Sequence, residues 1–193
     1  APRDVTFTCI LPNEVVAEPP YDVVLWGHGY GSSRFEFSSF VWAINRIGKA
    51  ACAFDFASHG VNVNAELEET VTQVLGGLHM FEFFEHLRVS RSRDLDNNGS
   101  LDSGGDQWSA DAFHTRDQVR QATVDWAQFI KSLRGCGTGT MKRDGDGVDV
   151  TTCDWDGDGA PDLGGPEAKF YIAGGSLGGI NASVAAPVLV DVE

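Results

Sequence analysis

Short apolar runs alternate along the chain with segments whose apolar residues recur every three to four positions. Runs of this length that end at glycine are typical of strands buried on both faces of a sheet, and the longer spacing is typical of amphipathic helices. The predicted strands span 5–11, 22–26, 50–56 and 169–173, the predicted helices span 35–47, 115–133 and 178–188, and residues 188–192 are expected to begin another strand. This order predicts an α/β fold with a mostly parallel sheet and flanking helices.

Two long stretches interrupt the alternation. The first, at about 61–112, holds an apolar, helix-prone segment at 64–88 that is broken by a glycine pair and followed by an Asp-rich loop. The second, at about 135–166, is rich in glycine and aspartate. We expect both stretches to be insertions into a single domain that spans residues 1–193.

A glycine-rich pentapeptide joins the last predicted strand to the helix that follows it. Its sequence, Gly174 to Gly178, matches the pattern G-x-S-x-G with Ser176 at the centre. A nucleophilic serine on such a strained turn needs small neighbours, and the helix N-terminus directs backbone N–H groups toward a developing oxyanion. The pattern therefore predicts Ser176 as a nucleophile. The alternatives are a plain glycine-rich connection and a phosphate-binding loop, although a Walker A motif would need Lys-Ser or Lys-Thr after the glycines.

Two backbone N–H groups are predicted to bind the oxyanion. In this arrangement the first belongs to the residue after the nucleophile, which is Leu177, and the second belongs to the loop after an earlier strand. The sequence His-Gly-Tyr-Gly at 28–31 follows the predicted strand at 22–26. Tyr30 is therefore the candidate for the second donor.

Four segments, taken in their order along the chain, resemble a known family. They are VVLWGHGYGSSR, AFDFASHG, TRDQVRQATVDWAQFI and FYIAGGSLGGINASVAAP, and the similarity covers most of 5–60 and 113–190. Together they resemble the bacterial secreted lipases and esterases of the α/β-hydrolase superfamily, of the kind often called virulence-factor lipases. Many relatives have histidine where this chain has Gly175, a departure that changes the polarity expected beside the nucleophile.

The resemblance implies an incomplete α/β-hydrolase-type domain that hydrolyses carboxylic esters, with an ester or a lipid as its substrate. It assigns the nucleophile to Ser176 and the oxyanion donors to Leu177 and Tyr30. It also implies a bacterial protein that is secreted, periplasmic or held at the cell surface. Two alternatives stay open: a calcium-stabilised binding or adhesion module without chemistry, and a thioesterase or peptidase of the same fold.

The other two members of the catalytic triad are expected to be missing from this chain. The order in this fold is serine, then Asp or Glu, then histidine, and all the histidines of the chain precede Ser176. We therefore expect the 193 residues alone to be inactive, or nearly so, on esters. His28 and His59, each followed by glycine at the end of a predicted strand, are expected to shape loops and not to transfer protons.

Two Asp-rich loops, at 94–102 and 154–162, share the pattern D-x-D-x-[DN]-G-x-x-D. Oxygen ligands at alternate positions of a tight loop, with glycine at the turn, are typical of calcium loops. The twelfth position is Gly105 or Gly165, not the Glu of an EF-hand, so we expect a structural calcium ion in a loop of another type. The alternative is a solvated acidic loop. The candidate ligands are Asp94, Asp96, Asn98, Ser100 and Asp102 in the first loop and Asp154, Asp156, Asp158, Ala160 and Asp162 in the second, with Asp144, Asp146 and Asp149 as a half-motif that could extend the second site.

Charge and hydropathy narrow the range of partners. The formal net charge is −14, which argues against nucleic acid or an anionic membrane surface as the main partner. No apolar run reaches the length of a transmembrane helix. The first residues lack the pattern of a signal peptide, so we expect a mature form or an excerpt.

Four cysteines predict two disulfides and an oxidising compartment, with four buried thiols as the alternative. Cys136 and Cys153 bracket a single loop, so their pairing needs no long-range register. If the sheet follows the usual α/β-hydrolase arrangement, the strands of Cys9 and Cys52 are neighbours, and these two residues are predicted to pair as well.

Overall fold

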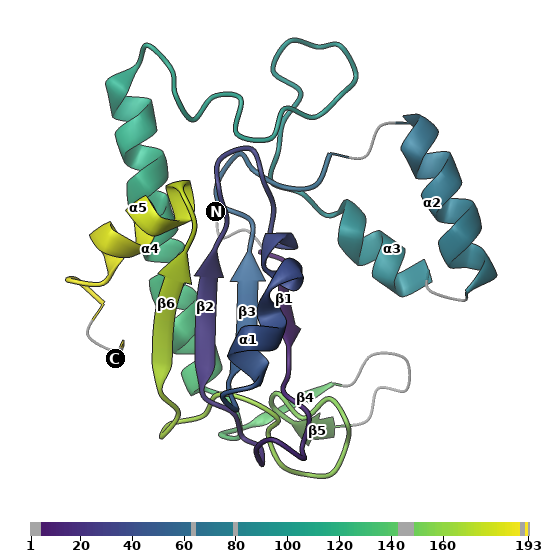
Figure 1. Cartoon of the computed structure of the whole chain (residues 1–193), viewed down its shortest axis with the longest axis vertical. Helices are drawn as coiled ribbons and strands as arrows, with labels where there is room; N and C mark the ends of the chain where they lie inside the picture. Colours follow the sequence, from purple (N-terminus) through teal and green to yellow (C-terminus); the bar gives the residue numbers. More distant parts are fainter. Residues whose placement is uncertain (1–4, 63–64, 79–80, 143–148, 190–191, 193) are drawn as a thin grey trace.

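A mostly parallel sheet of four strands lies at the centre of the structure (Figure 1). This computed structural model describes residues 5–62, 65–78, 81–142, 149–189 and 192. The strands are β1 (Phe7–Ile10), β2 (Val23–Gly27), β3 (Ala50–Phe54) and β6 (Phe170–Gly174). They lie in the order β1-β3-β2-β6, with β2 parallel to β3 and β6, and with β1 antiparallel to β3. The mostly parallel sheet expected from the apolar runs is therefore confirmed.

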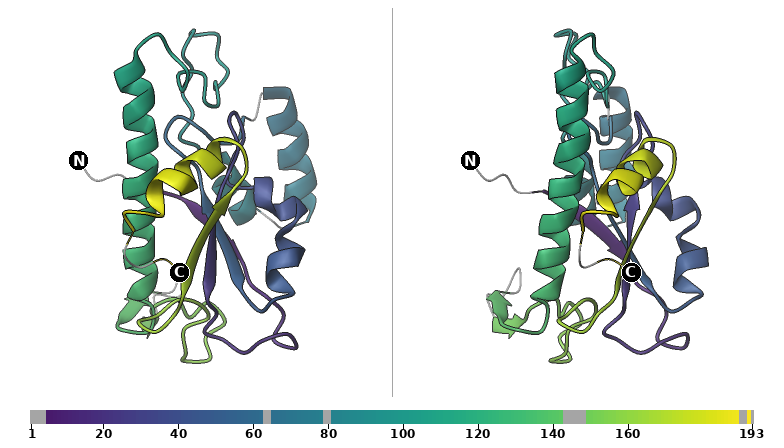
Figure 2. Two further views of the ribbon diagram at one scale, coloured as in Figure 1. Left: turned by 60° about the vertical axis from the view of Figure 1, so that its left-hand side comes forward. Right: turned by 90° about the vertical axis from the view of Figure 1, so that its left-hand side faces the viewer.

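Helices cover both faces of this sheet (Figure 2). They are the 3₁₀ helix η1 (Glu36–Ser39) and α1 (Val41–Asn45) on one face, and α4 (Ala112–Arg134) and α5 (Leu177–Ala185) on the other. Successive side chains of a strand point to opposite faces, so β3 contributes to two separate apolar clusters. Its Cys52 and Phe54 join the cluster of α4 and α5, and its Ala51 and Ala53 join the cluster of η1 and α1.

The longest helix, α4, is amphipathic, as its spacing predicts. Trp126, Ile130 and Leu133 are buried along one side of it. The carboxylate of Asp111 caps its first turn by accepting hydrogen bonds from the backbone N–H groups of the second and third helical residues. None of the described helices combines the length and the hydrophobicity that a bilayer crossing requires.

Two further helices, α2 (Ala65–Gly77) and α3 (Phe81–Arg88), follow β3 and lie beside the sheet (Figure 1). The glycine pair that was predicted to break this segment forms the last two residues of α2. Arg34 is fully buried and donates hydrogen bonds to the backbone carbonyls of His86 and Val89 and to the carboxylate of Asp55. Because Asp55 directly follows β3, this buried ion pair fixes the end of α3 to the end of that strand.

Two elements differ from the sequence-based expectation. The predicted helix at 35–47 is divided into η1 and α1, because Phe40 between them has a φ of −138°, outside the helical range. A short hairpin of β4 (Thr140–Lys142) and β5 (Asp149–Thr151) lies in the stretch that was predicted to be loop. Strands of three residues are too short for their alternation to be recognised in the sequence.

Both predicted disulfides are present. Cys9 and Cys52 are directly opposite each other on the antiparallel strands β1 and β3, with 4.1 Å between their Cα atoms. Cys136 and Cys153 are joined with a Cα separation of 5.3 Å, and their bond closes the loop that leads into the second Asp-rich loop. The neighbouring positions of β1 and β3 were expected from the α/β-hydrolase arrangement, and two disulfides fit an oxidising compartment.

Strands β2 and β6 and helix α5 meet at three glycines, with no side chain between them. A Cβ on Gly174 would lie 2.5 Å from the carbonyl carbon of Gly178 and 2.8 Å from the carbonyl oxygen of Gly27. A Cβ on Gly178 would overlap the carbonyl group of Gly27. Any larger residue at these positions would push α5 away from the sheet, because the closely packed backbone leaves no room for a side chain.

We expect Gly178→Ala to destabilise the protein by about 3 kcal/mol, the upper part of the usual range for overpacked sites, since the opposing atoms are backbone and cannot rotate away. The matched control is Gly77→Ala at the end of α2, where an added Cβ meets nothing within 4 Å. Urea unfolding of both variants measures the difference. Equal stability of the two variants would contradict the close approach of α5.

Candidate active site

Ser176 occupies a tight turn at the carboxyl end of the sheet. Strand β6 ends at Gly174 and α5 begins at Leu177, so only two residues reverse the chain from strand to helix. Ser176 has φ 50° and ψ −117°, a region that residues with a side chain rarely occupy. Its side chain is exposed, and its hydroxyl has no hydrogen-bond partner in the part of the chain that the structure describes. The strained strand-turn-helix conformation predicted for the G-x-S-x-G pattern is present.

The loop at residues 28–31, named the oxyanion loop after the role that the sequence predicts for it, lies directly beside this turn. A Cβ on Gly29 would lie only 3.7 Å from the Cβ of Ser176. Leu177 is the first residue of α5, and Tyr30 follows Gly29 in the loop. Among the described residues, neither of their backbone N–H groups has a partner, so both are free to donate to a ligand. The structure thus brings together the segments of all three residues that the sequence predicted for this site.

His28 holds the oxyanion loop from within and is fully buried. Its Nε2 accepts a hydrogen bond of 2.9 Å from the backbone N–H of Phe56, and its Nδ1 therefore carries the proton and donates to the carbonyl of Gly29 over 2.8 Å. Burial lowers the pKa of His28 to about 4. Its neutral ring joins the loops after β2 and β3, which agrees with the structural role expected for it.

The three other described histidines each have a polar contact with a group other than Ser176. His59 is buried, its Nδ1 lies 2.9 Å from the carbonyl oxygen of Ala57, and burial lowers its pKa. His114 lies 3.0 Å from a carboxylate oxygen of Asp106, and His86 lies 3.1 Å from the hydroxyl of Thr8. His79 lies outside the described residues. Among the described histidines, none is hydrogen-bonded to the Ser176 hydroxyl.

One acidic side chain at the site was missed by the sequence analysis. The carboxylate of Glu36, in the first turn of η1, accepts hydrogen bonds from the backbone N–H of Gly29 and from the indole N–H of Trp26. A single carboxylate a few residues beyond a His-Gly pair is the only signal that the sequence offers. Isolated carboxylates are common on protein surfaces, so that signal does not distinguish Glu36 from its neighbours.

The two Asp-rich loops share most of their internal hydrogen bonds. In each loop the first aspartate accepts from the N–H of the sixth residue, and the last aspartate accepts from the N–H of the second. Carboxylate oxygens of Asp94, Asp96 and Asp102, and likewise those of Asp154, Asp156 and Asp162, lie within 4.8 Å of one another. Clustered hard oxygen donors of this kind fit a divalent cation such as calcium.

The remaining predicted ligands of each loop are joined to one another by hydrogen bonds. Asp158 accepts a hydrogen bond from the N–H of Ala160, and Asn98 accepts one from the N–H of Ser100 in the equivalent position of the first loop. The half-motif falls partly outside the described residues, which exclude Asp144 and Asp146, whereas Asp149 lies in β5. Burial raises the pKa of Asp162, and the negative charges of Asp156 and Asp154 raise it further.

The loops lie at opposite ends of the sheet (Figure 1). At the carboxyl end, the hydroxyl of Ser103, next to the first loop, donates to the carbonyl of Ser32 and accepts from the N–H of Gly60. At the amino end, the backbone N–H of Tyr21 donates to the carbonyl of Asp162. The first loop therefore supports the edge that carries Ser176, and the second supports the opposite edge.

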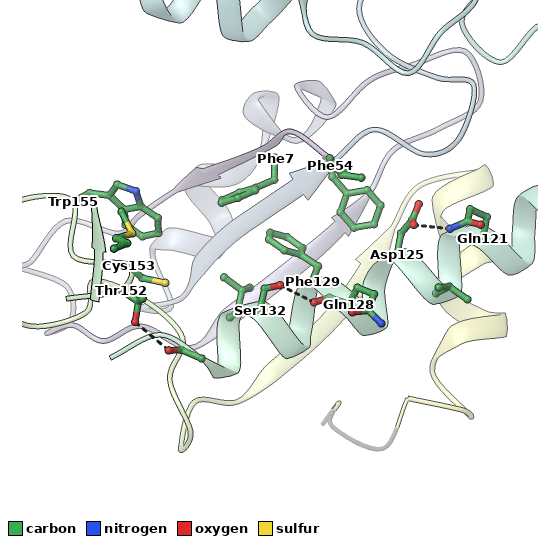
Figure 3. Close-up of a pocket in the computed structure, with 15 residues that line it drawn as sticks. Phe7, Phe54, Gln121, Asp125, Gln128, Phe129, Ser132, Thr152, Cys153 and Trp155 are labelled. Carbon is green, nitrogen blue, oxygen red and sulfur yellow. Dashed lines mark hydrogen bonds between the residues drawn. The ribbon is translucent and has the colours of Figure 1, made fainter. Parts of the chain in front are cut away.

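A separate apolar groove of about 1010 Å³ lies between α4, β1 and the second Asp-rich loop (Figure 3). Phe7, Phe54, Phe129 and Trp155 are among the side chains that line it. Ser176 and the oxyanion loop take no part in its lining, so this groove is not the predicted site.

The low pKa of His28 makes a prediction about stability and pH. In the unfolded chain histidine titrates near 6.5, whereas the folded pKa of His28 is about 4. Between these two values the unfolded state binds a proton that the folded state excludes, so the stability falls as the pH falls. This histidine alone should remove about 3 kcal/mol from the free energy of unfolding between pH 7 and pH 4.

The measurement is urea unfolding of the wild-type protein and of His28→Gln at a series of pH values. Other groups titrate in the same range, so the quantity of interest is the difference between the two proteins. We expect the wild-type protein to lose more stability than the variant as the pH falls. Parallel curves would show that His28 is protonated as easily in the folded protein as in the unfolded chain.

Comparison with known proteins does not assign this chain to a family. No protein-family model, no curated protein and no solved structure gives a significant match to this chain. The function of the site must therefore be inferred from the residues and the backbone conformations that form it.

Proposed function

We propose that this chain carries the nucleophile and the oxyanion-binding groups of a serine hydrolase of the α/β-hydrolase type, acting on carboxylic esters as a lipase or esterase. The single observation that carries the proposal is the conformation of Ser176. A serine held at φ 50° between a strand and a helix, with an exposed hydroxyl, is the arrangement that a nucleophile on a strained turn requires. Strain of this kind is concentrated at functional sites.

The proposed chemistry is nucleophilic acyl transfer. The Ser176 hydroxyl attacks the ester carbonyl, and the charge that develops on the carbonyl oxygen is stabilised by the N–H groups of Leu177 and Tyr30. A histidine takes the serine proton and returns it to the leaving alcohol, and an acid orients that histidine. We assign neither of these two residues to the described part of the chain, since in this fold both follow the nucleophile and every histidine of the chain precedes Ser176.

Calcium is proposed as a structural cofactor. The carboxylates of Asp94, Asp96 and Asp102 would hold one ion, and those of Asp154, Asp156 and Asp162 would hold a second. Bound calcium would neutralise like charges that otherwise repel each other within each loop. Two disulfides and the resemblance to secreted lipases support placing the protein outside the bacterial cytoplasm, as a secreted, periplasmic or cell-surface protein.

Labelling with a fluorophosphonate probe tests the proposed nucleophile. We expect the longest protein that the gene encodes to be labelled at Ser176, and Ser176→Ala to be unlabelled, because only an activated serine reacts with the probe. Ser183→Ala is a matched control, since Ser183 lies on α5 and its hydroxyl is bonded to the carbonyl of Gly179. Hydrolysis of p-nitrophenyl esters, thioesters and peptides then identifies the substrate class.

Labelling elsewhere than Ser176, or no labelling of a folded protein, would overturn the proposal and favour a binding module without chemistry. Preference for a thioester or a peptide would keep the nucleophile and change the substrate. The 193-residue chain alone is expected to react weakly, and full turnover by it would show that a base lies within the chain.

Calcium should raise the melting temperature, because an ion that binds only the folded state stabilises it. At a calcium concentration about 100 times Kd the gain is roughly 2.7 kcal/mol, which corresponds to several degrees for a chain of this size. Asp156→Ala combined with Asp158→Ala should remove much of the shift. Asp117→Ala, on the exposed side of α4, is the control and should keep it. Identical melting curves in calcium and in chelator would rule out the calcium sites.

A further inference from the structure

Glu36 connects the oxyanion loop to the end of β2. Its Oε2 accepts a hydrogen bond of 2.9 Å from the backbone N–H of Gly29, and its Oε1 accepts one of 3.3 Å from the indole N–H of Trp26. The side chain is half-buried. Trp26 is itself held in place by the ring of Phe40, with 4.4 Å between the ring centroids. The carboxylate thus receives one donor from the backbone of the loop and one from a packed side chain.

The same carboxylate lies beside the nucleophile turn. A Cβ on Gly29 would lie 3.1 Å from Oε2 of Glu36 and 3.7 Å from the Cβ of Ser176. A Cβ on Gly175 would lie 3.7 Å from Oε1 of Glu36. Glu36 is therefore adjacent to both backbone segments from which the predicted site is built, the oxyanion loop and the residue that precedes the nucleophile.

We infer that Glu36 is a positioning residue, which holds the oxyanion loop so that the N–H of Tyr30 faces the developing oxyanion. This inference rests on the proposed hydrolase function. Glycine is the least restricted residue of a loop, so a bond to the N–H of Gly29 removes the freedom that would otherwise displace Tyr30. A hydrogen bond to an ionised acceptor is about twice as strong as a bond between neutral groups, which suits a carboxylate to this task.

Positioning and charge predict opposite effects of removing Glu36. A carboxylate near the reacting carbonyl repels a developing oxyanion, so if charge dominated, its removal would raise kcat. If positioning dominates, removal lowers kcat, because a displacement of about 1 Å costs roughly 100-fold and the loss of one oxyanion donor costs about 100- to 1000-fold. The two hydrogen bonds of Glu36 already offset part of its charge, so the positioning effect prevails.

Kinetics of Glu36→Ala and Glu36→Gln on p-nitrophenyl esters test the inference, with the longest protein that the gene encodes. We expect kcat to fall about 100-fold in Glu36→Ala and about 10-fold in Glu36→Gln, which keeps one acceptor oxygen, with KM nearly unchanged. Binding of a boronic acid that mimics the tetrahedral intermediate should weaken in proportion to kcat. The exposed Glu167, at the amino end of the sheet, supplies the control Glu167→Gln, which should leave all three quantities unchanged.

The outcomes separate the inference from the function on which it rests. Suppose that Ser176→Ala abolishes turnover. The role of Glu36 would then be overturned if both Glu36 variants had a kcat equal to or above that of the wild-type protein, or if only KM changed. Turnover that survives Ser176→Ala, or no hydrolysis by the wild-type protein, would instead overturn the hydrolase function and the inference with it. Where Glu36→Ala does not fold, Glu36→Gln decides the result.

A second measurement needs no activity. In the 193-residue chain, Glu36→Gln should shift the amide resonance of Gly29 and the indole resonance of Trp26, since one of their acceptors is lost. The corresponding resonances in Glu167→Gln should not move. Unchanged positions of both signals in Glu36→Gln would show that the carboxylate does not hold the loop.

Discussion

The backbone contact between Gly27, Gly174 and Gly178 is the constraint on which the candidate site depends. It allows α5 to start directly above the ends of β2 and β6, so that only Gly175 and Ser176 lie between strand and helix. A turn this short forces Ser176 into its positive-φ conformation. Such strain persists only where the surroundings over-determine it, and here the pairing of β2 with β6 extends to the last residue of each strand.

Buried polar side chains hold the loops after β2 and β3 in place. The loops after β2 and β3 leave backbone groups at the edge of the sheet, and these need partners where water is excluded. His28 supplies two of them, one to each loop, and the Arg34–Asp55 pair joins the same edge to α3. The His28 ring forms both hydrogen bonds in its neutral form, so protonation of its Nε2 would remove the acceptor for the N–H of Phe56.

Two loops with one sequence pattern have similar internal hydrogen bonds and different neighbours. Both fold around their first aspartate, as their identical spacing predicts. The first loop is bonded through Ser103 to the edge of the sheet that carries Ser176, whereas the second is bonded to Tyr21 and braced by the Cys136–Cys153 disulfide. The pattern D-x-D-x-[DN]-G-x-x-D determines the local turns, and nothing in it determines which end of the sheet each loop supports.

Elements with a local physical cause could be predicted from the chain: the buried strands, the amphipathic α4, the turn at Ser176 and the repeated acidic loops. Strand order could be anticipated only through a resemblance, and the pairing of Cys9 with Cys52 followed from it. The position of Glu36 depends on packing, because its contacts with Gly29 and Trp26 require η1 to place its first residue beside the end of β2. The period of apolar residues, two in a strand and 3.6 in a helix, is visible in the sequence. A hydrogen bond across a loop depends instead on where packing places both partners.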